Sequence, residues 1–313
     1  MKVQIFLIGL ILFMSTASCG YDASFATKMV YVSGLSYCQA DQIVNDKCGK
    51  ATDQVRNTYK MDVEYAMDNG KSVNSITMAV LKSDNDKQYF VGFSGTRETS
   101  QLIAEIAESF PRSYEIHPEI GEAKVMDYFY QRYLDDFRDP FLQKIKEIIK
   151  GNPSYGITFT GHSLGGAMTV HAAADFILSG IDTNRKVQIY SFGQPRVGDH
   201  KFIDGFASKV SGFYRVTHSK DIVAHIPPCI TDLHDGCTES GILPFYPYHA
   251  PQEIWYNEDS SSYTQCSTKE GEDPTCSNSN ALNDSVDDHL KYLGLPISGL
   301  TSYPASLEEL LKA

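Results

Sequence analysis

The sequence has little positive charge and few long apolar runs. Its 313 residues include 27 lysines and arginines against 39 aspartates and glutamates, which gives a formal net charge of −12 at pH 7. A chain with this deficit of positive charge is not expected to bind nucleic acid or to be attracted to anionic membranes. Beyond the first 20 residues, no apolar stretch is long enough to cross a bilayer. Any contact with lipid would therefore have to be apolar.

Several motifs of cofactor-dependent enzymes are also missing. The sequence contains no H-E-x-x-H metal motif, no P-loop and no G-x-G-x-x-G dinucleotide motif. It contains no internal repeat. We therefore expect no metal or organic cofactor, and nothing in the sequence indicates an obligate protein partner.

The first 18 residues have the layout of a secretory signal peptide. Lys2 precedes the apolar run IFLIGLILFM, which is followed by the small-residue segment STASCG. The apolar run is too short for a membrane anchor. Lipid attachment at Cys19 is disfavoured, because a threonine stands three residues before it. The sequence predicts a secreted protein with a signal peptide at 1–18, one domain at 19–294 and a tail at 295–313.

If the signal peptide is cleaved after Cys19, six of the seven cysteines remain, and they are close neighbours in sequence. Proximity suggests three pairs, Cys38 with Cys48, Cys229 with Cys237, and Cys266 with Cys276. Other connectivities are possible for six cysteines. In an oxidising compartment we expect disulfides rather than free or metal-binding thiols.

Strand-like runs alternate with helical patterns along most of the chain. Helical pieces are predicted up to about Asn69 and at 124–150, 163–179 and 199–209, and strands at 76–81, 88–95, 157–160, 187–192, 213–217 and 253–256. The runs at 76–81 and 88–95 read as a hairpin. Alternating strands and helices predict an α/β fold with a mostly parallel central sheet and helices on both faces.

One junction between a strand and a helix indicates an enzyme. The segment Ile157–Gly166 reads ITFTGHSLGG, and a helical pattern follows without a loop. A turn this abrupt needs glycine at Gly161 and Gly165, because a Cβ there would collide with neighbouring backbone. Serine can also simply cap a helix. The strand before this G-x-S-x-G pattern and the helix after it favour Ser163 as a nucleophile.

A serine nucleophile needs a histidine base and a carboxylate that orients the histidine. In α/β-hydrolase-like sheets these residues follow in the order Ser, acid, His. Asp221 closely follows the strand FYRVTH and would lie at the carboxyl edge of the sheet, although a turn former would have the same position. His289 in DDHLKYLG comes last and is the best candidate base. Spacing alone does not exclude His249.

The oxyanion of the tetrahedral intermediate needs hydrogen-bond donors. The residue after the nucleophile, Leu164, would supply one backbone N–H. The second donor is expected from the loop after the strand YFVGFSGTRE, where Gly95 permits a sharp turn and Thr96 offers a backbone N–H and a hydroxyl. Without the sharp turn around Ser163 (residues 161–165, called the elbow below), this loop would be interpreted as an ordinary turn after a strand.

An amphipathic helix is predicted directly after this loop, at 98–110. Its apolar face carries Leu102, Ile103, Ile106, Ala107 and Phe110. A surface helix packed on the core has the same pattern. The position beside the expected oxyanion loop also allows a lid that covers the site in water and turns its apolar face toward lipid.

Taken together, these segments resemble the fungal-type (class 3) triacylglycerol lipases. The matching blocks, over roughly residues 75–295, are FSGTRE, TFTGHSLGGA, YSFGQPRVGD, HSKDIVAHIPP, HAPQEIWY, CSTKEGEDPTCSNS and DHLKYLG. The resemblance implies an α/β-hydrolase fold and a short disulfide loop like Cys266–Cys276. It also implies the triad Ser163, Asp221 and His289, and so favours His289 over His249.

By the same resemblance, Thr96 and Leu164 are the oxyanion donors, and a lid helix follows Thr96. The sequence departs from the family at two places. Ser94 stands where an arginine is common, and Gln101-Leu102 replaces an Asn-Trp pair at the start of the lid. These departures concern the lid and its hinge, not the triad.

The sequence therefore predicts a secreted serine hydrolase. It would cleave carboxylic ester bonds of acylglycerols, at an oil–water or membrane interface, through an acyl-enzyme. A phospholipase or a feruloyl-type esterase is the alternative on the same fold. A non-catalytic lipid-binding relative is less favoured because no triad residue is missing, and a serine peptidase is supported by G-x-S-x-G alone.

Overall fold

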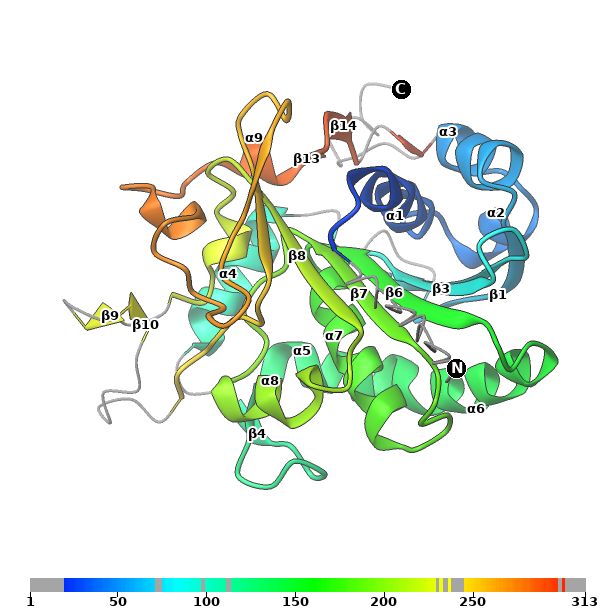
Figure 1. The fold of residues 1–313 in the computed structure, drawn as a ribbon, viewed down its shortest axis with the longest axis horizontal. Coiled ribbons are helices and arrows are strands. Elements are labelled where there is room, and N and C mark those ends of the chain that lie inside the picture. The colour runs from blue at the N-terminus through cyan, green and yellow to red at the C-terminus, as the bar shows by residue number, and fades with distance from the viewer. Residues whose placement is uncertain are drawn as a thin grey trace, which may run out of the picture.

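The structure is a computed structural model that describes residues 20–70, 75–96, 99–110, 114–228, 231–232, 236–237, 245–297 and 300–301. The expected signal peptide at 1–18 lies outside these residues. The centre of the fold is an eight-stranded sheet with the order β1-β2-β3-β6-β7-β8-β11-β12 (Figure 1). Its strands are β1 (Asp62–Asp68), β2 (Thr77–Ser83), β3 (Gln88–Phe93), β6 (Gly156–His162), β7 (Val187–Phe192), β8 (Gly212–His218), β11 (Glu253–Tyr256) and β12 (Tyr263–Gln265).

Within the described residues, three two-stranded ladders lie outside this sheet. They are β4 (Tyr114–Ile116) with β5 (Lys124–Met126), β9 (Thr231–Asp232) with β10 (Gly236–Cys237), and β13 (Lys291–Tyr292) with β14 (Leu295–Pro296). The α-helices are α1 (Ala23–Leu35), α2 (Ala40–Val44), α3 (Gly49–Thr52), α4 (Thr99–Ser109), α5 (Asp127–Tyr133), α6 (Asp139–Ile148), α7 (Leu164–Leu178), α8 (His200–Ala207) and α9 (Val286–His289). Short π-helical or 3-10 turns occupy Asp53–Thr58, Leu134–Arg138, Ile149–Gly151, Val223–His225 and Ser277–Ser279.

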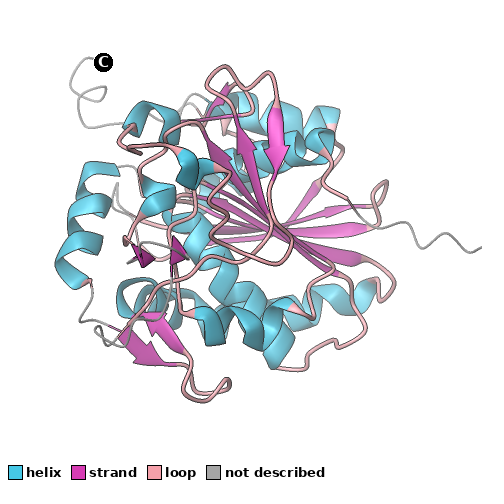
Figure 2. Cartoon of the chain, turned by 60° about the vertical axis from the view of Figure 1, so that its left-hand side comes forward, coloured by secondary structure: helices cyan, strands magenta, loops and turns pink. Residues whose placement is uncertain are grey.

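The direction of the strands confirms the expected fold class. Strands β3, β6, β7, β8 and β11 run parallel to one another, while β1, β2 and β12 add antiparallel edges. The sheet twists strongly, with helices on both faces (Figure 2). This is the mostly parallel α/β arrangement of α/β-hydrolase-like proteins.

Two hydrophobic clusters, one on each face, hold the helices to the sheet. Alternate residues of β3 enter different clusters: Val91 and Phe93 belong to the cluster that includes residues of α5 to α8, and Phe90 to the cluster that includes α1. Helix α1 is capped by Asp22, whose carboxylate accepts the backbone N–H groups of Ser24 and Phe25. The period-two alternation of apolar side chains thus supports helices above and below the same strands.

The predicted strands are all present, but two helical predictions are wrong in part. Residues 62–68 form β1 instead of continuing the helical pieces. As an edge strand, β1 pairs on one side only and is partly exposed, so its polar residues hide the strand pattern. The helix expected at 124–150 begins at Asp127, because 124–126 pair with β4. Within the described part of the chain, no helix combines the length and the apolar character needed to cross a membrane.

The start of the expected tail packs on the domain. Leu295 and Pro296 form β14, and Ile297 and Leu300 are buried in the same hydrophobic cluster as α1. A Cβ on Gly34 of α1 would lie 2.7 Å from Leu300 Cδ1, so this leucine lies directly on the helix backbone.

Candidate active site

Ser163 lies at the turn between β6 and α7. Its backbone has φ 60° and ψ −128°, and residues with a side chain rarely adopt a positive φ. Two glycines permit the turn. A Cβ on Gly161 would lie 2.3 Å from the carbonyl oxygen of Gly165, and a Cβ on Gly165 would lie 2.3 Å from that of Phe93. Strain of this kind at a residue with a side chain is typical of functional sites.

Asp221 lies three residues beyond the end of β8 and is buried. Its carboxylate accepts hydrogen bonds from Nδ1 of His289, at 3.0 and 2.9 Å, from the backbone N–H of Val223 at 2.7 Å and from the hydroxyl of Tyr292. Burial opposes ionisation of Asp221, but the charge of His289 and the hydrogen bonds from His289 and Tyr292 outweigh it and lower the pKa of Asp221 to about 2. The carboxylate is therefore ionised at neutral pH and orients the imidazole.

Backbone pairing brings His289 to this carboxylate. Ser285 pairs with Asp221 in an isolated parallel bridge, in which the N–H of Ser285 donates to the carbonyl of Lys220 at 3.0 Å. The side chain of Ser285 also caps α9 by accepting the N–H of Asp288. His289 is the last residue of this one-turn helix.

His289 also lies beside the elbow. Its ring packs against the ring of His162, the neighbour of Ser163, with 4.5 Å between the ring centroids and an angle of 31° between the ring planes. Ser163 Oγ and His289 Nε2 are both buried, and neither has a hydrogen-bond partner among the described residues. These are the two atoms between which a proton moves when a histidine activates a serine.

The loop after β3 also lies against this turn. A Cβ on Gly95 would lie 2.6 Å from the carbonyl oxygen of His162 and 2.9 Å from Ser163 Cβ, so only glycine allows this approach. Thr96 follows Gly95 directly and is partly exposed. Leu164 is the first residue of α7, where backbone N–H groups have no acceptor within the helix. The arrangement thus places both expected oxyanion donors on segments that adjoin Ser163.

Sequence reasoning missed Gly193 and Tyr292. Gly193 has φ +56°, and a Cβ there would lie 2.6 Å from the hydroxyl of Tyr292, 2.7 Å from Asp221 Oδ2 and 2.8 Å from His289 Nδ1. Gly193 therefore makes room for this hydrogen-bonded group. The only signal in the sequence is a glycine directly after the strand Val187–Phe192.

The alternative base, His249, has a different environment. Its Nε2 donates to the carbonyl of Ala224 at 2.8 Å, and its backbone N–H donates to Glu272 at 3.0 Å. Burial, followed by the charge of Arg215, holds the pKa of His249 well below its usual value. Glu272 is itself paired with the buried guanidinium of Arg196, with two contacts of 2.7 Å. His249 thus belongs to a buried polar network rather than to the Asp221 carboxylate.

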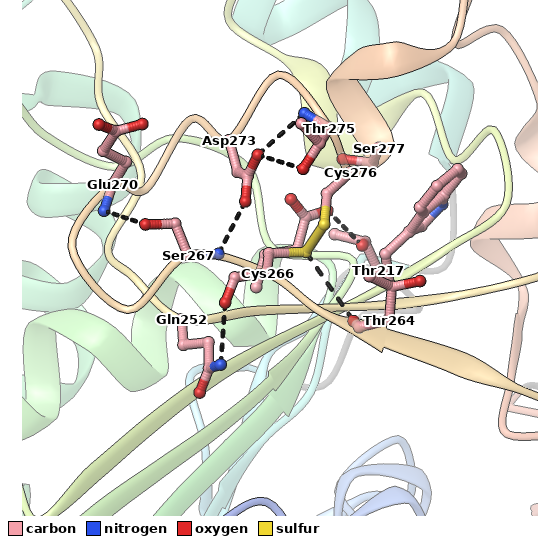
Figure 3. The surroundings of a disulfide bond; sticks show 12 residues. Thr217, Gln252, Thr264, Cys266, Ser267, Glu270, Asp273, Thr275, Cys276 and Ser277 are labelled. Atoms are coloured by element: carbon pink, nitrogen blue, oxygen red, sulfur yellow. Dashed lines mark hydrogen bonds between the residues drawn. A yellow bond between two sulfur atoms is a disulfide. The ribbon is translucent and has the colours of Figure 1, made fainter.

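A disulfide between Cys266 and Cys276 closes the polar loop after β12, as expected (Figure 3). Inside this loop, Asp273 accepts the backbone N–H of Ser267 at 2.7 Å and that of Thr275 at 2.9 Å. Glu253 lies within 4.8 Å of both sulfurs. Because the sulfurs are joined, they offer no thiolate to a metal.

The other two expected disulfides have different outcomes. Cys38 and Cys48 are both buried, but they are not joined to each other, so this prediction is wrong. Cys38 lies three residues beyond the end of α1 and Cys48 directly precedes α3, and closeness along the chain did not indicate how these elements are placed. Cys229 lies outside the described residues, which leaves its pairing with Cys237 a prediction.

The expected lid segment forms α4 and rests on the core. Leu102 and Ile106 are buried, and Ile103 packs against the same cluster. Glu105 accepts a hydrogen bond from the hydroxyl of Tyr128 on α5 and lies 3.9 Å from the guanidinium of Arg132. Apart from Ala107, which is exposed, the apolar face of α4 is thus largely covered in this structure.

Comparison with known proteins agrees with this geometry. The family Lipase (class 3) matches residues 90–231. A lipase of Rhizomucor miehei is 31% identical over 218 residues, which cover 69% of this chain and 54% of the relative. The chain thus spans about half the length of this curated relative.

Two solved structures share the fold. A lipase from Rhizopus microsporus var. chinensis superposes with a TM-score of 0.73 at 25% identity, covering 89% of this chain and 90% of that chain. A triacylglycerol lipase whose catalytic centre is a serine protease triad superposes with a TM-score of 0.70 at 25% identity, covering 89% and 96%. In sequence and in fold alike, the chain belongs to the fungal-type class 3 lipase family.

Proposed function

We propose that this protein is a secreted serine hydrolase that cleaves carboxylic ester bonds of acylglycerols. The observation that carries the proposal is the position of Ser163. It stands at a strained turn next to His162, whose ring centroid lies 4.5 Å from that of His289, the imidazole that the ionised, buried Asp221 carboxylate holds by Nδ1. Membership in a lipase family, and the triad of a structurally similar triacylglycerol lipase, support the same chemistry.

In this proposal, Ser163 Oγ attacks the carbonyl carbon of the ester while His289 Nε2 takes the hydroxyl proton. Asp221 stabilises the resulting imidazolium, which then gives the proton to the leaving alcohol as the tetrahedral intermediate collapses to an acyl-enzyme. Water then attacks the acyl-enzyme and gives a proton to His289 Nε2. The imidazolium returns this proton to Ser163 Oγ as the second tetrahedral intermediate collapses and releases the fatty acid.

Thr96 and the N–H of Leu164 would bind the oxyanion of each tetrahedral intermediate. Leu164 begins α7, so the positive end of the helix dipole also faces this position. Loss of one such donor typically costs about 2.7–4 kcal/mol of transition-state stabilisation. The close approach of Gly95 to Ser163 supports this assignment.

The substrate would be a lipid ester at an oil–water or membrane interface. We propose that α4 is a lid, which must move for its buried apolar residues to meet lipid. Its position directly after Thr96 supports this role, and the net charge of −12 leaves apolar contact as the route to a lipid surface. The signal-peptide layout of residues 1–18, with the apolar run IFLIGLILFM, and the Cys266–Cys276 disulfide support secretion.

The test is fatty-acid release from an emulsified long-chain triacylglycerol by the purified mature protein, with a soluble short-chain ester assayed beside it. We expect both activities, and we expect both to be lost in Ser163→Ala. Cleavage of the soluble ester without fatty-acid release from the triacylglycerol would show an esterase of narrower substrate range instead of a lipase. Activity on neither substrate would favour a non-catalytic lipid-binding protein.

A further inference from the structure

Two consecutive backbone carbonyls, those of Asp288 and His289, each face a buried imidazole. Nδ1 of His218 lies 2.9 Å from the carbonyl oxygen of Asp288, and Nε2 of His162 lies 2.7 Å from that of His289. The side chains of His218 and His162 belong to residues that are only 1% and 2% exposed. A carbonyl oxygen can only accept, so the hydrogen bond at each of these atoms requires a proton on the imidazole nitrogen. Nε2 of His218 also faces a carbonyl oxygen, that of Glu258 at 3.0 Å, so the ring donates to both carbonyls only when both nitrogens carry a proton, and the proposal concerns the bond to Asp288.

The two imidazoles come from rigid positions. His162 is the last residue of β6 and His218 the last residue of β8, and the two strands lie on either side of β7. Helix α9, which carries His289, has a single turn, Val286–His289. A helix this short is not stabilised by its own hydrogen bonds, so its orientation depends on anchors from neighbouring elements.

The proton on His162 is fixed by a third residue. Burial, followed by the charge of His289, lowers the pKa of His162 to about 3, so its ring is neutral near pH 7. With that single proton on Nε2, toward the carbonyl, Nδ1 is an acceptor. The hydroxyl of Tyr37, at 2.7 Å from Nδ1, is then the donor to it. Tyr37 thereby favours the tautomer that bonds the carbonyl of His289.

We propose that His162 and His218 are positioning residues for the base. By holding the carbonyls of residues 288 and 289, they fix the backbone of His289 so that its Nε2 is directed toward Ser163. This inference rests on the proposed function, in which His289 is the base. The Asp221 carboxylate sets the rotation of the ring, whereas the two imidazoles set the position of the chain that carries it.

Asparagine and glutamine test the proposal, because they place an amide N–H at different reach. The amide of Asn lies about where Nδ1 of histidine lies, and that of Gln about where Nε2 lies. His218→Asn and His162→Gln can therefore keep the bonds to the carbonyls of Asp288 and His289. His218→Gln would instead reach the carbonyl of Glu258, which lies 3.0 Å from Nε2, and His162→Asn would reach Tyr37.

On a soluble short-chain ester, we expect the two variants that keep a bond to retain kcat within about threefold. We expect the two that lose a bond to fall about 10- to 100-fold in kcat with KM unchanged, since a small misplacement of the base has this effect. Asn is thus the favoured substitution at position 218, and Gln is the favoured one at position 162. A role in packing alone would give no such reversal, and equal effects of Asn and Gln at both positions would overturn the proposal.

For each variant, kcat is normalised to the concentration of folded protein, which near-UV circular dichroism measures. Should the histidine variants not fold, Tyr37→Phe keeps the packing of the ring and removes the hydroxyl that donates to His162. We expect a loss of about 3- to 10-fold in kcat at constant KM, because the proton of His162 is then free to move to Nδ1. Wild-type kcat in Tyr37→Phe would remove His162 from the proposal.

Two further variants separate this inference from the proposed function. If Ser163→Ala and His289→Ala retain hydrolysis, the proposed triad itself is wrong. If both are inactive while Asn and Gln have equal effects at 162 and 218, the triad stands and only the positioning role fails.

Discussion

Tyr292 donates a hydrogen bond from its hydroxyl to Oδ2 of Asp221, the same oxygen that lies 2.9 Å from Nδ1 of His289. Burial, followed by the negative charge of Asp221, holds the pKa of Tyr292 well above its ordinary value, so the hydroxyl remains a donor throughout the neutral range. Beside His289, the carboxylate thus has a second side-chain donor that keeps it ionised in a buried site.

Replacing Tyr292 by phenylalanine should weaken this carboxylate. We expect the free energy of unfolding to fall by about 1.5–3 kcal/mol, which is typical for a hydrogen bond to a charged group. We expect kcat/KM on a soluble ester to fall about 10-fold. Urea denaturation and ester kinetics measure both effects. Tyr263→Phe, at a residue that is 38% exposed, is the control, and equal behaviour of the two variants would contradict this role of Tyr292.

The strained backbone of Ser163 should make glycine more stable than alanine at this position. Ser163 has φ 60°, which glycine adopts without the penalty of a Cβ. We expect Ser163→Gly to exceed Ser163→Ala by about 1 kcal/mol in the free energy of unfolding, with both inactive. At Ser208, where φ is −63°, alanine should be the more stable. The same order at both serines would show that the elbow stores no strain.

Buried neutral histidines should make the protein sensitive to acid. Burial, followed by the charge of His117, lowers the pKa of His171 from 6.5 to about 3. Between these pH values the unfolded chain binds a proton that the folded chain excludes. Stability is therefore lost as pH falls, by about 1.4 kcal/mol per pH unit for each such group.

His171→Leu should reduce the slope of the unfolding free energy against pH by the contribution of one proton, about 1.4 kcal/mol per pH unit. Neither ring nitrogen of His171 has a hydrogen-bond partner within the described residues, so an apolar side chain leaves no donor unsatisfied. We expect a flatter dependence of the unfolding free energy between pH 6.5 and 3, and no change in slope between pH 7 and 9. Denaturant titrations across both ranges provide the measurement, and an unchanged acid slope would contradict a neutral His171.

The proposed lid predicts a difference between substrates. Ile103→Ser and Ile106→Ser should reduce activity on emulsified triacylglycerol about 10-fold more than activity on a soluble ester, because the apolar face of α4 would contact lipid. Ala104→Ser, on the exposed side of the same helix, should affect neither substrate. Ile106 is buried, so thermal unfolding must be measured for each variant. Equal losses on the two substrates would rule out a lid.

Sequence patterns predicted most of the fold because its central strands are short apolar runs bounded by clear turns. The runs at 187–192 and 253–256 coincide with β7 and β11. The edge strand β1 was not predicted, because a half-exposed strand needs few apolar residues. The break before Asp127 was not predicted either, since apolar residues continue through it.

The candidate site could be assembled from the sequence as far as chain order determines it. Chain order and resemblance predicted Ser163, Asp221 and His289 as partners, and their catalytic roles stay proposals. Tyr292 and Gly193 were missed, because their importance lies in a hydrogen bond and a close contact between loops that are distant in sequence. The same reason explains the error at Cys38 and Cys48, where spacing along the chain says little about distance in space.

The packing of Leu300 on Gly34 connects the end of the described chain to the strand before the elbow. Gly34 follows Ser33, whose hydroxyl lies 3.0 Å from that of Thr160 in β6. A protease that cuts the backbone shortly before Leu300 would therefore do more than trim a terminus. It would remove packing from α1 and weaken the contact of this helix with Thr160 in β6, the strand that ends beside Ser163. We therefore expect limited digestion near this end of the described chain to inactivate the enzyme slowly.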